Sequence, residues 1–234
     1  MPLSVLYSDE QLMAVDKPAG QLVIPGRGER ERTLIDDAQE ACGRLWVVHR
    51  LDRGTSGVVL FPRTAEAHRT LNLAFDRREV LKRYLAIVRG APPQEARIDV
   101  PIAPARRGRM RPARPADPKA KSAATLVRLL SAYTPQPPLP RLALVEVLPE
   151  TGRTHQIRVH LAWAGTPLAV DPDYGERAPL LGAGGEVLLA RTPLHAASLE
   201  LRHPATGAPL RIEAPLPEDM ARAIAAAEGV RPVP

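Results

Sequence analysis

One segment constrains the fold of this chain more than any other: residues 49–57, His-Arg-Leu-Asp-Arg-Gly-Thr-Ser-Gly, which run directly into the apolar residues 58–61. A short apolar run bounded by turn residues is typical of a buried strand. A loop fixed by such a strand is a common place for a functional side chain. Asp52, which follows Arg50 and precedes Arg53, is therefore a candidate nucleophile. The alternative is an ordinary turn residue or a surface ion pair.

Length and composition limit the class of protein. A chain of 234 residues can bury a sizeable core without disulfides, and we expect a single domain over residues 1–234. Cys42 is the only cysteine, which fits a reducing compartment, and we expect a cytoplasmic protein. No run of eighteen apolar residues is present, so we expect no membrane association. The formal charge of +6 favours a polyanionic partner.

Hydrophobic patterning predicts more strands than helices, in hairpin-like succession. Helices are expected from Thr33 to about Cys42, after Thr64 and over 217–227. We therefore predict an α+β fold with a mostly antiparallel mixed sheet and flanking helices. The predicted strands are 3–7, 12–15, 21–24, 58–61, 84–88, 123–130, 142–148, 187–190, 194–201 and 210–212.

Two further segments carry candidate functional side chains. Residues 151–161 predict a helix with Thr154 as its N-cap and Arg158 on the flank of its buried face. A guanidinium there can keep a partly buried carboxylate ionised, although an arginine on a helix is more often a surface residue. Residues 82–90 predict a strand that carries Tyr84, whose ring can stack on a base or simply pack in the sheet.

Five segments together resemble the motifs of the RluA-type RNA pseudouridine synthases, in the order in which that family has them. They cover nearly the whole chain. Residues 168–171 depart from the family, which usually has a glycine where Val170 precedes Asp171, so we expect the shape of this loop to differ from the family's. The matching segments are VDKPAG (15–20), HRLDRGTSG (49–57), KRYLAIVRG (82–90), GRTHQIRVH (152–160), and RTPLHA (191–196) with His203-Pro204.

The resemblance implies roles for four residues. Asp52 would be the catalytic residue, Arg158 would pair with it, and Tyr84 would lie against the target uracil. Arg50 would enter the RNA where the target nucleotide leaves, which suits a guanidinium that can stack on bases. The resemblance also implies the pseudouridine synthase catalytic fold, with an active-site cleft across the sheet. It further implies a catalytic domain without the additional N-terminal RNA-binding domain of many members.

The reaction implied is the isomerisation of specific uridines in a structured RNA, a tRNA or rRNA stem-loop, without a cofactor. The sequence leaves open whether Asp52 attacks the base, attacks the sugar or acts as a base. We predict no metal site, since His155 and His160 are not at the spacing of a metalloprotease helix. No obligate protein partner is predicted. A basic, mobile loop over Arg106–Arg114 could hold phosphates or could be a solvated connection.

Two other functions stay open. One is a non-catalytic RNA-binding module of the same fold that acts in ribosome assembly. The other is a nucleoside hydrolase, although such enzymes usually need a second carboxylate and these segments supply none.

Overall fold

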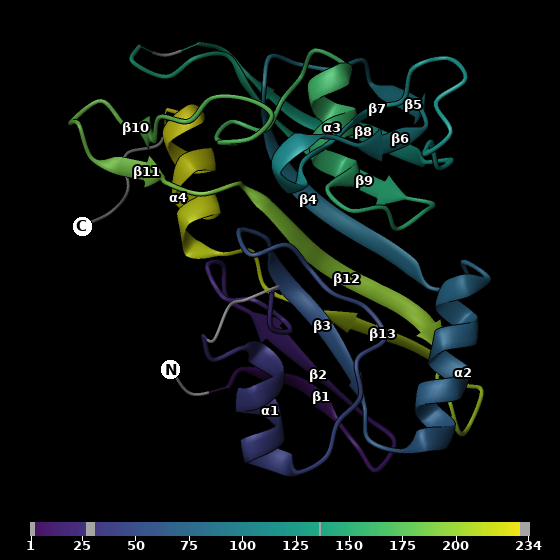
Figure 1. Ribbon diagram of the computed structural model, residues 1–234. Helices are drawn as coiled ribbons and strands as arrows, with labels where there is room; N and C mark the ends of the chain where they lie inside the picture. The colour runs from purple at the N-terminus through teal and green to yellow at the C-terminus, as the bar shows by residue number, and fades with distance from the viewer. Residues whose placement is uncertain (1–2, 27–30, 136, 230–234) are drawn as a thin grey trace. The chain divides into compact units, whose positions relative to one another are not determined.

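The structure is a computed structural model that describes residues 3–26, 31–135 and 137–229 (Figure 1). The chain forms two compact units. The first comprises Met1–Lys82 and His195–Pro215, and the second comprises Arg83–Leu194 and Leu216–Pro234. Each unit is therefore built from segments that are distant in the sequence. The expectation of a single domain stays a prediction.

The first unit contains a five-stranded sheet in the order β1, β2, β3, β12, β13. Only the β3–β12 pair is parallel, with Ser56 opposite His195. All seven residues of β3 are buried, as its apolar sequence predicts. The strands are β1 (Val5–Ser8), β2 (Leu12–Lys17), β3 (Ser56–Pro62), β12 (Leu194–Arg202) and β13 (Pro209–Glu213).

Helices α1 (Leu34–Cys42) and α2 (Ala65–Asp76) flank this sheet (Figure 1). Both begin at the predicted caps. The Asp36 carboxylate accepts hydrogen bonds from the Thr33 backbone N–H (2.9 Å) and hydroxyl (2.7 Å). The Thr64 hydroxyl accepts from the Ala67 N–H at 3.1 Å. Because capping is a local interaction, the sequence predicted both helix starts.

The second unit contains a four-stranded antiparallel sheet in the order β4, β9, β8, β5. Helix α3 (Gln156–Trp163) packs on one face with Ala86 and Val88, and α4 (Glu218–Ala227) packs on the other with Ile87. Alternate residues of a strand face opposite sides, so β4 serves both cores. The strands are β4 (Leu81–Arg89), β5 (Glu95–Asp99), β8 (Ala124–Tyr133) and β9 (Leu142–Pro149).

Two small ribbons complete the second unit. Strands β6 (Ile102–Pro104) and β7 (Met110–Pro112) form an antiparallel hairpin around a short 3₁₀ turn, Arg106–Gly108. Strands β10 (Leu180–Leu181) and β11 (Val187–Leu189) form the other ribbon. Figure 1 shows the β6–β7 hairpin beside α3. The hairpin therefore lies against the helix that carries Arg158.

The predicted α+β class with a mostly antiparallel mixed sheet is confirmed. The strand predicted at 21–24 is wrong. The carbonyl oxygens of Leu22 and Val23 instead accept hydrogen bonds from the first N–H groups of α1, at 2.8 and 3.1 Å. The loop predicted over Arg106–Arg114 is also wrong for Met110–Pro112, which form β7. Strands β5, β6, β7 and β10 were not predicted, since three of them are only two or three residues long.

Candidate active site

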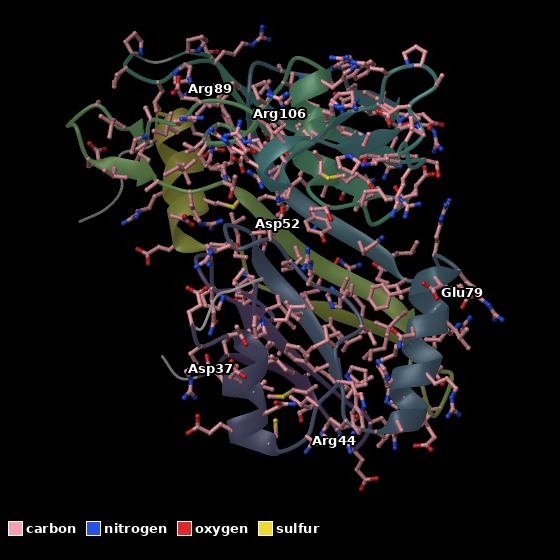
Figure 2. All side chains as sticks on the ribbon, in the orientation of Figure 1. Asp37, Arg44, Asp52, Glu79, Arg89 and Arg106 are labelled. Atoms are coloured by element: carbon pink, nitrogen blue, oxygen red, sulfur yellow. The ribbon has the colours of Figure 1, made fainter. Side chains whose placement is uncertain are left out.

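Asp52 lies on the turn that precedes β3 (Figure 2). The Thr55 N–H donates to the Asp52 carbonyl oxygen at 3.0 Å and closes the turn. The side chain of Asp52 is partly buried, whereas Arg50 and Arg53 are exposed. Leu51 is buried between them and anchors the segment to the core. The carboxylate is thus carried by a hydrogen-bonded turn on a buried strand, as the sequence predicted.

The same turn is held from the other side by the Lys17-Pro18-Ala19-Gly20 segment. Lys17 is fully buried, and its Nζ donates to the carbonyl oxygens of Pro18 (2.8 Å), Gln21 (2.7 Å) and Arg53 (3.2 Å). The Gly20 N–H donates to the same Arg53 oxygen at 2.8 Å. Two donors therefore fix the carbonyl group of Arg53, the residue that directly follows Asp52. Lys17 belongs to the VDKPAG motif, but nothing in the motif predicts this contact.

Behind the turn, β3 and β12 lie very close together. A Cβ atom built on Gly57 would lie 2.2 Å from the Ala196 carbonyl oxygen, so only glycine fits there. One residue earlier, the Ser56 hydroxyl is 3.0 Å from His195 Nδ1. The other ring nitrogen of His195 lies 3.3 Å from the Ala214 carbonyl oxygen. The base of the Asp52 turn is therefore tied to two neighbouring segments of the first unit.

His49 fixes the chain that leads into the turn. Its Nε2 accepts a hydrogen bond from the Leu60 N–H at 2.9 Å, and its ring stacks on Phe75 at a centroid distance of 5.0 Å. Desolvation, together with the nearby charge of Lys82, lowers the pKa of His49 to about 4. The ring is therefore neutral at physiological pH, as an acceptor must be.

Arg158 occupies the first turn of α3 and is almost completely buried. Its guanidinium makes a bidentate pair with Asp171 (2.9 and 2.7 Å) and a third contact with Asp173 (2.9 Å). It also lies over the Tyr174 ring, with Cζ 4.9 Å from the ring centre. Arg158 is therefore buried, and the alternative of a surface arginine is wrong. Its partners Asp171 and Asp173 were not predicted.

The start of α3 differs from its prediction. The N-cap is His155, with a left-handed φ of 53°, and not Thr154. The His155 Nδ1 lies 2.7 Å from the Tyr174 hydroxyl. This contact joins the cap to the 171–175 loop. A non-glycine residue with positive φ is uncommon and is often found at functional positions.

The 171–175 loop, which departs from the family pattern at Val170, is closed by its own hydrogen bonds. The Gly175 N–H donates to the Asp171 carbonyl oxygen at 2.9 Å. The Asp171 carboxylate accepts from the N–H groups of Asp173 (3.0 Å) and Tyr174 (3.2 Å). Val170 itself is buried in the core under α4. Valine is used here for packing, and the turn forms without a glycine at that position.

Tyr84 lies on β4 opposite Val147 and packs at the margin of the core that α3 covers. The ring is partly buried. The structure therefore places Tyr84 and α3, which carries Arg158, on one face of the second sheet. Asp52 and Arg50 belong to the first unit, so the predicted partnership of Asp52 with Arg158 is a proposal taken up below.

Neither a metal site nor a membrane helix emerges from the described residues. Within them, no group of three or more His, Cys, Asp or Glu side chains could hold a metal ion. No helix in the described part of the chain is long and apolar enough to cross a membrane.

Comparison with known protein families gives the class of this protein, an isomerase that acts on RNA. A family model described as RNA pseudouridylate synthase matches residues 11–163, which include the Asp52 turn, β4 and α3. The chain belongs to the RNA pseudouridylate synthase family.

Relatives and a solved structure agree with this assignment. The chain is 39% identical to ribosomal large subunit pseudouridine synthase D of Xanthomonas campestris over 97% of its length and 70% of the relative. It is also 39% identical to the protein of that name from Nitrosomonas europaea, over 94% of this chain and 64% of the relative. Human RNA pseudouridylate synthase domain containing 4 is 27% identical and superposes with a TM-score of 0.74, over 96% of this chain and 92% of that one.

Proposed function

We propose that this protein converts specific uridines of large-subunit ribosomal RNA to pseudouridine, with Asp52 as the catalytic carboxylate and without a cofactor. The observation that carries the proposal is the Asp52 turn, which is clamped by Lys17 and Gly20 and seated on a buried strand. Relatives named for the large ribosomal subunit support this RNA over tRNA. A fixed carboxylate suits a reaction in which one group must reach one atom of the nucleotide.

The isomerisation needs no external atoms. The N1 to C1′ bond breaks, the uracil turns, and C5 bonds to C1′. C5 then loses its proton and N1 gains one, so the base keeps its composition. Asp52 acts on the nucleotide as a nucleophile or as a base.

Arg158, Tyr84 and Arg50 are proposed to bind the target nucleotide and its surroundings. Arg158 would keep the Asp52 carboxylate ionised, because a guanidinium stabilises an ionised carboxylate in a desolvated site. Tyr84 would support the uracil with its ring. The exposed Arg50 would take the place that the target base leaves in the RNA.

Asp52→Asn is the decisive variant, because it removes the charge and keeps the shape. Tritium release from RNA labelled at uridine C5 measures the reaction, and Asp76→Asn on the exposed end of α2 is the matched control. We expect Asp52→Asn to lose at least about 10³-fold in rate and Asp76→Asn to retain wild-type activity. Full activity of Asp52→Asn would overturn the catalytic assignment.

The choice of RNA is tested separately. Unmodified large-subunit RNA and an unmodified tRNA pool are offered to the wild-type enzyme, and pseudouridines are mapped in both. We expect modification at a small number of sites in the ribosomal RNA. Modification confined to tRNA would reject the proposed substrate while leaving the chemistry intact. Release of free uracil would identify a hydrolase, and binding without any reaction would identify an RNA-binding module.

The partnership of Asp52 and Arg158 is tested with Arg158→Lys, which retains a positive charge. Arg158→Met is less informative, because it leaves the buried Asp171 carboxylate without its bidentate partner and destabilises the fold. If Arg158 acts through Asp52, Arg158→Lys slows the wild-type enzyme but has little further effect in the Asp52→Asn background. Equal effects in both backgrounds would separate the two residues.

A further inference from the structure

The contacts of Arg158 continue outward to the basic β6–β7 hairpin. Asp173, which contacts Arg158 at 2.9 Å, also pairs with Arg109 at 3.1 Å. Arg109 directly follows the 3₁₀ turn of the hairpin. Carboxylates and guanidinium groups thus alternate in a series of four. The series runs from the buried Asp171 through Arg158 and Asp173 to the half-exposed Arg109. The outermost member of this series is the one that a bound anion can reach.

A second contact joins the same two elements. The Tyr174 hydroxyl accepts a hydrogen bond from the Met110 N–H at 2.8 Å, while the Tyr174 ring lies beneath the Arg158 guanidinium. Met110 is the first residue of β7. Burial raises the pKa of Tyr174, so the hydroxyl stays protonated at physiological pH. The hairpin is therefore held to the Arg158 cluster at two adjacent residues, Arg109 and Met110.

The charges of the cluster depend on Arg109. Burial would raise the pKa of Asp173, but the hydrogen bond from Arg158 and the charges of Arg158 and Arg109 lower it overall. Without Arg109, one guanidinium would face two carboxylates. Arg158 would then be less able to stabilise a further anionic group. A change at the exposed end of the series therefore alters the electrostatics at its buried end.

We propose that Asp173 and Tyr174 are positioning residues that couple RNA binding at the β6–β7 hairpin to the action of Arg158. The Arg109 ion pair uses Nε. A guanidinium has two further amino groups, which can donate to an RNA phosphate. A phosphate bound there completes a continuous series from RNA through Arg109 and Asp173 to Arg158. The inference rests on the proposed function, since it assumes that Arg158 serves the reaction with RNA.

The test is a double-mutant cycle of Arg109→Gln and Asp173→Asn, with single-turnover rate and RNA dissociation constant measured separately. We expect each single variant to slow the single-turnover rate by about 5-fold or more, and the double variant to be no slower than either. Arg109→Lys should recover part of the rate, because it restores the charge without the planar geometry. A purely structural role would change the folded fraction and not this rate.

A second double-mutant cycle, which combines Arg107→Gln with Asp173→Asn, is the matched control. Arg107 lies on the same 3₁₀ turn and is exposed, and no acidic partner for it appears among the described residues. We expect its loss to weaken RNA binding and to combine additively with Asp173→Asn. If Arg109→Gln and Asp173→Asn change the single-turnover rate additively, the coupling is overturned. The same holds if the cycle with Arg107 and the cycle with Arg109 give the same interaction with Asp173.

Tyr174→Phe addresses the second contact without disturbing the ring beneath Arg158. It should accelerate amide exchange at Met110 and lower the single-turnover rate; unchanged values of both would exclude Tyr174 from the coupling. The wild-type enzyme separates the two proposals. If it forms no pseudouridine in any RNA, the proposed function fails. If it is active and the cycles are additive, only the coupling fails.

Discussion

Lys17 donates a hydrogen bond from Nζ to the carbonyl oxygen of Arg53, the residue directly after Asp52, at 3.2 Å. The ammonium group is fully buried and contacts two further carbonyl oxygens. A buried charge is retained only where such donors and acceptors are well matched. Lys17 therefore sets the position of the turn that presents the candidate carboxylate.

Lys17→Met should destabilise the protein by about 2 to 4 kcal/mol, because it keeps most of the apolar part of the side chain but removes the buried ammonium group and its hydrogen bonds to three carbonyl oxygens. Chemical denaturation measures the change. The exposed Lys119→Met is the control and should stay within about 0.5 kcal/mol of wild type. A Lys17 variant as stable as wild type would show that the clamp contributes little to the fold.

His49 should make stability depend on pH. The folded-state pKa of about 4 lies below the ordinary value of 6.5, so the unfolded chain binds more protons between these values. The free energy of unfolding therefore falls as the pH decreases through this range, by at most about 3 kcal/mol from this residue. Unfolding titrations at several pH values between 7.5 and 4 measure it.

His49→Gln isolates this contribution, because a glutamine amide can accept from the Leu60 N–H without titrating. We expect the stability advantage of wild type over the variant to shrink as the pH falls. An advantage that stays constant over the range would assign the acid sensitivity to other groups.

Gly57→Ala should be strongly destabilising, by more than about 3 kcal/mol, because the added Cβ meets the Ala196 backbone and the φ of 112° is strained for alanine. Thermal unfolding measures the effect. Gly43→Ala, with a φ of 78° but open space around the new Cβ, isolates backbone strain and should cost only about 1 to 2 kcal/mol. Equal losses would mean that the β3–β12 approach relaxes easily.

The hairpin arginines should carry part of the electrostatic affinity for RNA. Replacement of Arg106 and Arg107 by glutamine should flatten the dependence of log affinity on log salt by about 0.7 per lost phosphate contact. The control replaces Arg69 and Arg77, two exposed arginines of α2 and its C-cap, with the same loss of charge. If both pairs change the slope equally, net charge and not the hairpin determines RNA affinity.

The sequence alone predicted the structural features that are determined by residues close together in the chain. The caps at Thr33 and Thr64, the apolar strand of residues 58–61 and the turn that carries Asp52 are all specified within a few residues. Local hydrogen bonds and side-chain alternation determine such features. Short strands such as β6 and β7 were missed because three residues give no readable period.

Only the tertiary structure decided which groups meet across long stretches of sequence. Lys17 meets the Arg53 carbonyl, Arg158 meets Asp171 and Asp173, and Asp173 meets Arg109. Nothing near these residues in the chain indicates their partners. The partners are selected when the strands and α3 pack, because burial then requires each charged group to find a matching donor or acceptor in space.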